Sequence, residues 1–184
     1  MAPSLLAPRL AVPVLLLVLA AAAAAAEGVA GAGMTHLHFF IHEVFTAGPN
    51  ATTATVVAPP ARSDGGSSSF GFVGVVDDML REGADPASRL VGRAQGVTAG
   101  TSLADGAITT MLNLVFTEEG PYAGSTLQVF GRAVLGTVME RPVVGGTGKF
   151  RMARGYTLSR RVNSSDPDNL LVIEYDAYVT TSPI

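Results

Sequence analysis

Apolar and polar residues alternate along most of the chain after residue 34, with the two-residue period of a β-strand rather than the longer period of a helix. Near the C-terminus this alternation places Leu171, Ile173, Tyr175 and Ala177 on one face. Glycine, proline, aspartate and serine separate such runs, as is typical between strands. We therefore predict eight strands, at residues 35–45, 52–59, 70–80, 89–100, 107–118, 125–134, 143–162 and 169–180.

The connections between these runs are too short for the crossover helices of a parallel sheet, so the strands are predicted to be antiparallel. A sandwich and a closed barrel both fit the pattern. A closed barrel removes the edge strands that promote aggregation, and eight strands enclose room for one small ligand. The sequence therefore predicts an all-β fold, an eight-stranded antiparallel β-barrel.

The glycine-rich stretch "VVGGTGKFRMARGY", residues 143–156, has the composition of a phosphate-binding loop but not its spacing. A P-loop needs glycine where Val143 stands and a hydroxyl residue where Phe150 stands. The dinucleotide fingerprint fails because Arg151 occupies the place of its third glycine. We interpret the stretch as a turn between strands, in which glycine supplies backbone conformations that other residues avoid.

The first 26 residues have the features of a secretory signal peptide: a single basic residue, an apolar run and alanines before Glu27. A transmembrane anchor is the alternative, but the strongly apolar run is short and contains Pro13. We expect a cleaved signal peptide at 1–26, a flexible N-terminus at 27–34, and one extracellular domain at 35–184.

Composition narrows the classes of function. Without residues 1–26, the chain carries 11 Lys and Arg against 15 Asp and Glu, which argues against binding to nucleic acid or an anionic membrane. There is no cysteine, so a secreted domain must rely on its core, helped by oligomerisation. Asn50 and Asn163 begin glycosylation sequons beside turn residues, and we predict glycans there.

Three histidines, His36, His38 and His42, lie on one face of the first predicted strand, because even steps separate them. The first two form a His-x-His pair, a pattern found in metal sites. Glu43 faces the other side of the strand, and the chain has no further histidine. We therefore expect solvated or hydrogen-bonded histidines and no metal site.

Three acids, Glu43, Asp77 and Asp78, are candidates for proton transfer. Adjacent strand residues point to opposite faces, so Asp77 and Asp78 do not form an acid–base couple with each other. Either acid could cap the following turn, or enter the barrel, where an apolar environment would raise its pKa and let it donate a proton. Arg93 has two interpretations as well, a contact in the site or a structural ion pair.

Several motifs occur in the order found in the dirigent proteins of plants: "FFIHEV", "FGFVGVVDDMLREG", "VGRAQG", "LVFTEEGPYAGSTLQVFGR", "VVGGTGKFRMARGY" and "EYDAYV". The resemblance covers about residues 37–179. It implies a secreted protein of the plant apoplast, with an eight-stranded barrel like that of allene oxide cyclase and a homotrimeric or homodimeric assembly.

The resemblance also implies a chemistry. Dirigent proteins as a class have no oxidative centre, so no cofactor and no classified activity of the chain's own are expected. A separate laccase or peroxidase makes phenoxy radicals from a monolignol such as coniferyl alcohol. The dirigent pocket then holds the radicals, or the resulting quinone methide, so that one stereoisomer forms; this is catalysis by positioning.

Four positions depart from the lignan-forming members of the family. Glu43 stands where they have aspartate, Val97–Gly100 replaces a segment with tyrosines, and Arg132-Ala133 replaces an aspartate. The nearest counterpart of a further arginine is Arg141, which would substitute for it if the loop shifts. The expected pocket acids are Glu43, Asp77 and Asp78, and the expected substrate-binding residues are Phe39, Arg93, Thr98, Asn113, Arg141 and Tyr175.

Three functions follow from the resemblance. The first is guidance of monolignol radical coupling in lignan or lignin metabolism. The second is proton-assisted closure or dehydration through a quinone methide, as some dirigent-like proteins perform on isoflavonoid-type alcohols, without an oxidase. The third is a defence protein of the cell wall that binds phenolics or glycans and directs no chemistry.

Overall fold

The computed structural model describes residues 33–59, 69–117 and 119–181. The chain divides into two units, Met1–Met34 and Thr35–Ile184. The predicted signal peptide at 1–26 and most of the predicted flexible N-terminus at 27–34 lie outside the described residues. No helix among the described residues is long and apolar enough to cross a membrane.

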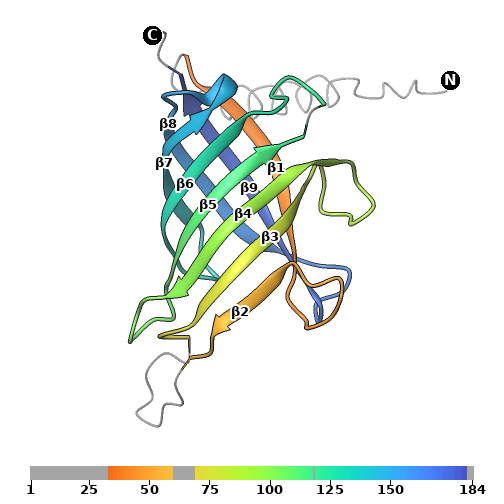
Figure 1. The fold of residues 1–184 in the computed structure, drawn as a ribbon, viewed down its shortest axis with the longest axis vertical. Helices are drawn as coiled ribbons and strands as arrows, with labels where there is room; N and C mark the ends of the chain where they lie inside the picture. The colour runs from red at the N-terminus through yellow and green to blue at the C-terminus, as the bar shows by residue number, and fades with distance from the viewer. Residues whose placement is uncertain (1–32, 60–68, 118, 182–184) are drawn as a thin grey trace, which may run out of the picture. The chain divides into compact units, whose positions relative to one another are not determined.

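The second unit is built from β-strands that all pair antiparallel, with one short 3-10 helix (Figure 1). The elements are β1 (Thr35–Val44), β2 (Thr53–Val57), β3 (Val73–Arg81), β4 (Leu90–Gly100), β5 (Ile108–Phe116), β6 (Thr126–Ala133), β7 (Met139–Thr147), η1 (Gly148–Phe150), β8 (Arg154–Val162) and β9 (Leu170–Thr180).

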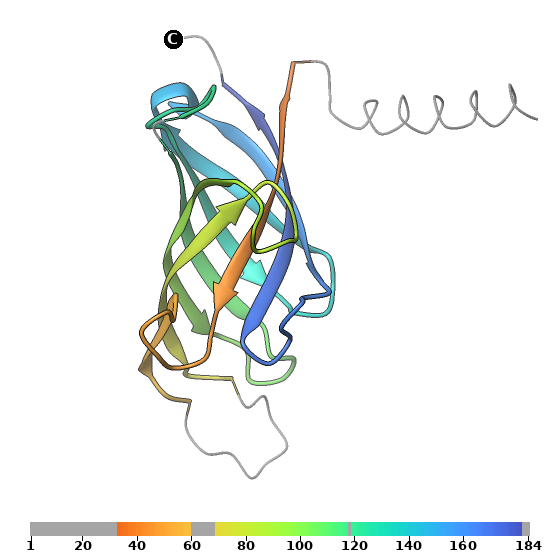
Figure 2. The ribbon, with the colours of Figure 1, turned by 90° about the vertical axis from the view of Figure 1, so that its right-hand side faces the viewer.

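The sheet closes into a barrel because β1 pairs with both β9 and β3. Figure 2 shows β1 running between these two strands. The closed ring consists of eight strands, β1 and β3 to β9, and β2 pairs with the part of the β3 edge that β1 does not reach. The predicted eight-stranded antiparallel barrel is therefore confirmed.

The membership of the ring differs from the prediction in two places. The second predicted strand, 52–59, is β2, which is not part of the closed ring. The single strand predicted at 143–162 is wrong, because this stretch contains the end of β7, the helix η1 and all of β8. The cause is the run of glycines in β7 and η1, which carry no side chain and so hide the alternation that marks a strand. The interpretation of the glycines as a turn holds.

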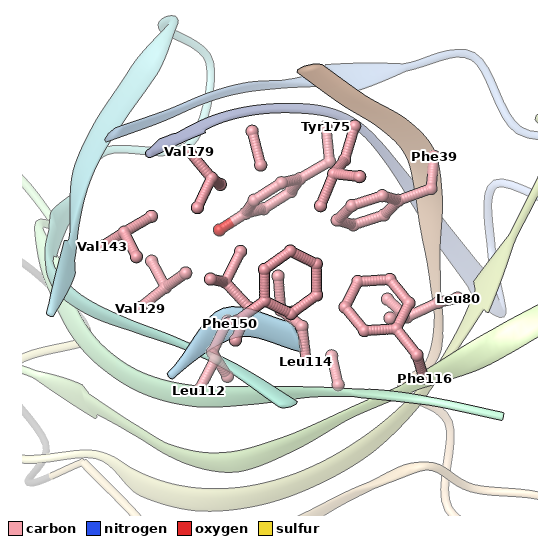
Figure 3. Packing of buried hydrophobic residues seen from close by; sticks show 14 of the residues in the cluster. Phe39, Leu80, Leu112, Leu114, Phe116, Val129, Val143, Phe150, Tyr175 and Val179 are labelled. Carbon is pink, nitrogen blue, oxygen red and sulfur yellow. The ribbon is translucent and has the colours of Figure 1, made fainter. Parts of the chain in front are cut away.

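One half of the barrel interior is filled by an aromatic core (Figure 3). Phe39 of β1 stacks on Tyr175 of β9, with ring centroids 5.3 Å apart, and meets Phe116 edge-on at 6.4 Å. Phe150 comes from η1 and lies 5.5 Å from Phe116. Tyr122 stacks on Phe150 at 5.0 Å. The turn after β7 therefore carries an aromatic side chain into this half of the barrel.

Strand β3 changes its partner halfway along its edge. Residues Val73–Val76 pair with β2, and Met79–Arg81 pair with β1. Between the two ladders, the backbone N–H of Asp77 donates to the carbonyl of Thr52 at 2.8 Å, and the N–H of Thr52 donates to the carbonyl of Val44 at 2.9 Å. These bonds bring the end of β1, the start of β2 and the middle of β3 to one place.

We predict that Gly155→Ala unfolds the barrel or lowers its free energy of unfolding by about 3 kcal/mol or more. Gly155 has φ of 149°, and a Cβ there would lie 1.9 Å from the carbonyl oxygen of Tyr178 on β9. The matched control is Gly136→Ala, which also has positive φ, at 93°, but meets no atom within 4 Å. Urea unfolding should show a loss of only about 1–2 kcal/mol for the control; equal losses would contradict the steric argument.

Candidate active site

A cavity of about 430 Å³ occupies the half of the barrel that the aromatic core leaves free. It lies where β1 ends and β9 begins, and it is lined from every strand of the ring except β8, as well as from β2. Most of its wall is apolar, with Ile41, Val76 and Leu112 among the contributors. A cavity of this size and character is suited to a small organic ligand.

Two carboxyl groups, Glu43 and Asp78, lie in the wall of this cavity. They lie close together because Asp78 stands where the pairing partner of β3 changes from β2 to β1, and Glu43 stands near the end of β1. The hydroxyl of Thr52 donates to Oδ1 of Asp78 at 2.6 Å and accepts the N–H of Val44 at 2.8 Å. The hydroxyl of Thr53 donates to Oε1 of Glu43 at 2.6 Å. Each acid is thus held by one of two adjacent threonines at the start of β2.

Burial changes the protonation of both acids. Loss of water contact raises the pKa of Asp78 to about 8, the neighbouring Glu43 carboxylate adds to the rise, and the Thr52 hydrogen bond partly opposes it. Burial also raises the pKa of Glu43, against the effect of the bond from Thr53. A carboxyl group that stays protonated near neutral pH can donate a proton to a ligand.

A positively charged group lies on another wall. The Arg141 side chain is only 4% exposed, and it donates to Thr110 Oγ1 at 3.0 Å and to Ser159 Oγ at 2.7 Å. Its guanidinium carbon lies 5.2 Å from the centre of the Tyr175 ring. None of the ion pairs formed by the described residues includes Arg141, and its Nε has no hydrogen-bond partner. Such a guanidinium attracts an anionic or strongly polarised oxygen.

Comparisons with known proteins agree on one family. The family model described as "Dirigent-like protein" matches residues 34–180. The chain belongs to the dirigent family. It is 40% identical to dirigent protein 1 of Arabidopsis thaliana, over 83% of this chain and 82% of that protein. It is 37% identical to pterocarpan synthase 1 of Glycine max, over 79% of this chain and 77% of that protein.

Solved structures of dirigent proteins have the same fold. The pterocarpan synthase dirigent protein PsPTS1 superposes with a TM-score of 0.72 and 32% identity, over 83% of this chain and 98% of that chain. The pterocarpan synthase dirigent protein GePTS1 gives 0.70 and 33%, over 82% and 88%. The cavity described above is therefore the interior of a dirigent barrel.

Several residues expected in the dirigent pocket are where the sequence places them. Glu43, Asp78, Thr98 and Arg141 all line the cavity. Arg141 lines it from strand β7. Phe39 and Tyr175, both expected to bind substrate, do not line this cavity. They belong to the aromatic core, where the Tyr175 ring packs against the Arg141 guanidinium.

Three other expected residues, Asp77, Arg93 and Asn113, do not line this cavity. Asp77 is adjacent to Asp78 and so faces the outside, where Arg93 Nε donates to its Oδ1 at 2.5 Å. The alternative interpretation of Arg93, a structural ion pair, is the one that the structure has. Asn113 is exposed, and its side-chain carbonyl accepts a long bond of 3.4 Å from Gln128. Strand alternation decides all three positions.

Four residues that hold the site are not among those predicted from the sequence. Thr52 and Thr53 carry the two acids, and Thr110 and Ser159 hold Arg141. Of these four residues, only Thr52 and Thr53 could have been suspected from the sequence. They directly follow a turn, and hydroxyl side chains beside turns often hydrogen-bond to neighbouring groups. The predicted glycosylation residues, Asn50 and Asn163, are exposed and lie outside the strands; their occupancy stays a prediction.

We predict that Asp78→Asn stabilises the fold at high pH. Above its ordinary pKa of 3.8, Asp78 loses its proton in the unfolded chain but keeps it in the barrel up to about pH 8. The wild-type free energy of unfolding therefore falls as pH rises through this window, by at most on the order of 1 kcal/mol per pH unit. Asparagine has no such titration, and its carbonyl can still accept the Thr52 hydroxyl.

Urea unfolding at pH 4, 6 and 8 measures this effect. The stability of Asp78→Asn relative to wild type should increase at each step in pH. Asp77→Asn is the matched control, because that carboxyl group is exposed and ion-paired on the outer wall. A relative stability of Asp78→Asn that is constant across the three pH values would contradict the raised pKa.

Proposed function

We propose that the cavity binds a plant phenol and controls its ring closure through a quinone methide, with Asp78 and Glu43 transferring the protons. The observation that carries this proposal is the pair of carboxyl groups with raised pKa in a mostly apolar cavity. The pKa of Asp78, raised to about 8, is suited to general acid catalysis near neutral pH, and burial moves the pKa of Glu43 in the same direction. Arg141, on another wall, supplies the complementary positive charge.

The reaction is a dehydration followed by an addition. Protonated Asp78 donates its proton to the hydroxyl group that leaves the benzylic carbon, and Glu43, when ionised, accepts the proton of the phenol. Water and a neutral quinone methide result. A second hydroxyl of the same substrate then adds to the methide carbon and gives its proton to Asp78, while the quinone oxygen takes back the proton held by Glu43, so that both acids return to their starting states. The net change is loss of one water, with no oxidant or reductant.

Arg141 has a separate part in this scheme. Negative charge develops on the phenolic oxygen as its proton leaves and again as the quinone oxygen accepts electrons during ring closure. A buried guanidinium with an unused N–H stabilises such charge more strongly than water does. The occurrence of pterocarpan synthases among the relatives, at 37% and 35% identity, supports ring closure as the reaction type.

The second candidate function is guidance of monolignol coupling. In that case a laccase or peroxidase makes the phenoxy radicals from coniferyl alcohol, and the cavity orients the partners or the quinone methide that they form. The apolar wall supports this candidate, because positioning alone can select one stereoisomer. Both candidates place the protein in the extracellular space and require no cofactor.

We predict that the protein converts a phenolic benzylic alcohol carrying a second hydroxyl, such as an isoflavanol, to its cyclised product without an oxidase. Asp78→Asn should lower kcat/KM by roughly 100-fold or more, because the leaving hydroxyl loses its proton donor. Glu43→Gln should have a similar effect. Asp77→Asn, whose carboxyl faces outward, should stay within about twofold of wild type. Chiral chromatography of the product measures both rate and handedness.

A second arm uses coniferyl alcohol with a laccase and albumin as the control protein. An enantiomeric excess here, with no turnover in the oxidase-free arm, would overturn the first candidate in favour of guided coupling. Racemic dimers together with no oxidase-free turnover would contradict both, and would leave a protein that binds phenols without directing chemistry.

A row of apolar side chains crosses the outer wall of the barrel. Val75, Val97, Met111 and Phe130 are cross-strand neighbours on β3 to β6. Met111 is 50% exposed, Phe130 45% and Val75 43%. Large exposed apolar side chains that are contiguous are typical of interaction surfaces. We propose that this row seats a second copy of the chain in a homotrimer or homodimer.

We predict that Met111→Glu dissociates the assembly, since it places a charge in the middle of the row. Light scattering coupled to gel filtration should then give the mass of one chain. Leu103→Glu is the matched control, because Leu103 is 53% exposed but lies in the loop between β4 and β5. An assembly unchanged by Met111→Glu, or a wild type that is already monomeric, would contradict the proposal.

A further inference from the structure

Two histidines and an aspartate meet on the outer wall of the barrel, away from the cavity acids. His36 and His38 are outward-facing residues of β1, and Asp176 is an outward-facing residue of β9. The register of the two strands places His38 directly opposite Asp176 and His36 opposite Tyr178. The three residues therefore share one patch, although about 140 positions separate the histidines from the aspartate along the chain.

The side-chain atoms that could bind a metal ion lie close to one another. Nε2 of His36 lies 2.7 Å from Oδ1 of Asp176, and Nδ1 of His38 lies 2.8 Å from the same oxygen. One ligand atom from each residue falls within 4.8 Å of the others. Two imidazole nitrogens and one carboxylate oxygen at such distances need only small side-chain rotations to surround an ion at metal–ligand distances of about 2.0–2.2 Å.

The two rings are held in place by their neighbours. His36 stacks on Tyr178, with centroids 4.6 Å apart and planes 5° apart. His38 packs edge-on against Phe40, with centroids 5.2 Å apart. Side chains held in this way lose little conformational freedom when they bind an ion.

The charge around the patch is suited to a cation. Glu174, the next outward-facing residue of β9, lies 3.9 Å from Nε2 of His38. Its other oxygen pairs with Arg160 at 2.5 Å. The patch thus has two carboxylates, Asp176 and Glu174, and one arginine, Arg160, while Glu82 and Arg89, which line the adjoining cavity, pair with each other. His36 and His38 also line a second cavity, of about 250 Å³, which leaves room for water or another oxygen ligand on the ion.

We propose that His36, His38 and Asp176 form a binding site for a divalent transition-metal ion of the Zn²⁺ type. Imidazole nitrogen and carboxylate oxygen are ligands that this class of ion prefers, and three protein ligands leave a position for solvent. The ion links β1 to β9 beside the seam of the barrel, where β1 pairs with β3 through only three residues. The third histidine, His42, is buried, and its Nε2 bonds to the carbonyl of Gly83 at 2.9 Å, so it takes no part.

The test uses the secreted protein without a histidine tag, titrated with Zn²⁺ in a calorimeter at pH 7.5. Wild type should bind one ion per chain. His36→Ala and His38→Ala should each lower the affinity at least about 100-fold, and Asp176→Asn about 10-fold. Asp105→Asn is the matched control, an exposed ion-paired carboxylate on another part of the surface, and should bind as wild type does.

Two further measurements separate the site from a loss of folding. Zn²⁺ should raise the Tm of wild type and not that of His38→Ala or of the more conservative His38→Gln, all compared with their metal-free forms. Imidazole NMR signals of His36 and His38 should shift with Zn²⁺ while that of His42 stays unchanged. Unaltered affinity in folded His38→Ala, or a shift confined to His42, would overturn the proposal, as would the lack of saturable binding by wild type.

Discussion

The hydrogen bonds of Thr52 at the change of partner on β3 are the constraint on which the cavity depends. The ladder between β1 and β3 ends at Met79, and the ladder between β2 and β3 begins at Val76. Thr52 fills the interval: its carbonyl accepts the N–H of Asp77, its N–H donates to the carbonyl of Val44, and its hydroxyl accepts the N–H of Val44. The same Thr52 hydroxyl donates to Asp78, so one residue both joins the two ladders and orients an acid of the cavity.

The polar groups buried in the cavity wall lower the stability of the fold. Each buried carboxyl group is more stable in its protonated form, and a buried guanidinium without a carboxylate partner costs free energy. The barrel accepts both Asp78 and Arg141 in a wall that apolar residues could fill. The compensation lies in the other half, where Phe39, Phe116, Phe150 and Tyr175 pack closely. The aromatic half of the barrel therefore offsets the free-energy cost of the polar groups in the cavity half.

The outer wall also has separate apolar and polar regions. On β3 to β6, cross-strand register lines up apolar side chains in one row, and in a neighbouring row it lines up Asp77, Gln95, Asn113 and Gln128. On β1 and β9 it places His38 opposite Asp176 and His36 opposite Tyr178. The rows on β3 to β6 are made by consecutive strands, whereas the patch on β1 and β9 joins the two ends of the barrel sequence. In a closed antiparallel barrel, successive side chains of each strand point inward and outward in turn, so the residues of the cavity and those of the outer surface form separate sets.

The sequence by itself determined the all-β class, the antiparallel pairing and the family, because local alternation, turn residues and motifs are enough for these. It named Glu43 and Arg141 as candidates for the pocket without deciding that either faces inward. It misjudged the stretch 143–162, where glycines remove the alternating signal, and it listed both Asp77 and Asp78 because a strand pattern alone does not say which face is inside. Only the tertiary structure decided that Asp78 points inward, that Thr52 holds it, and that Asp176 meets His36 and His38. Partner choice and register are properties of the closed ring, and no short segment of the chain contains them.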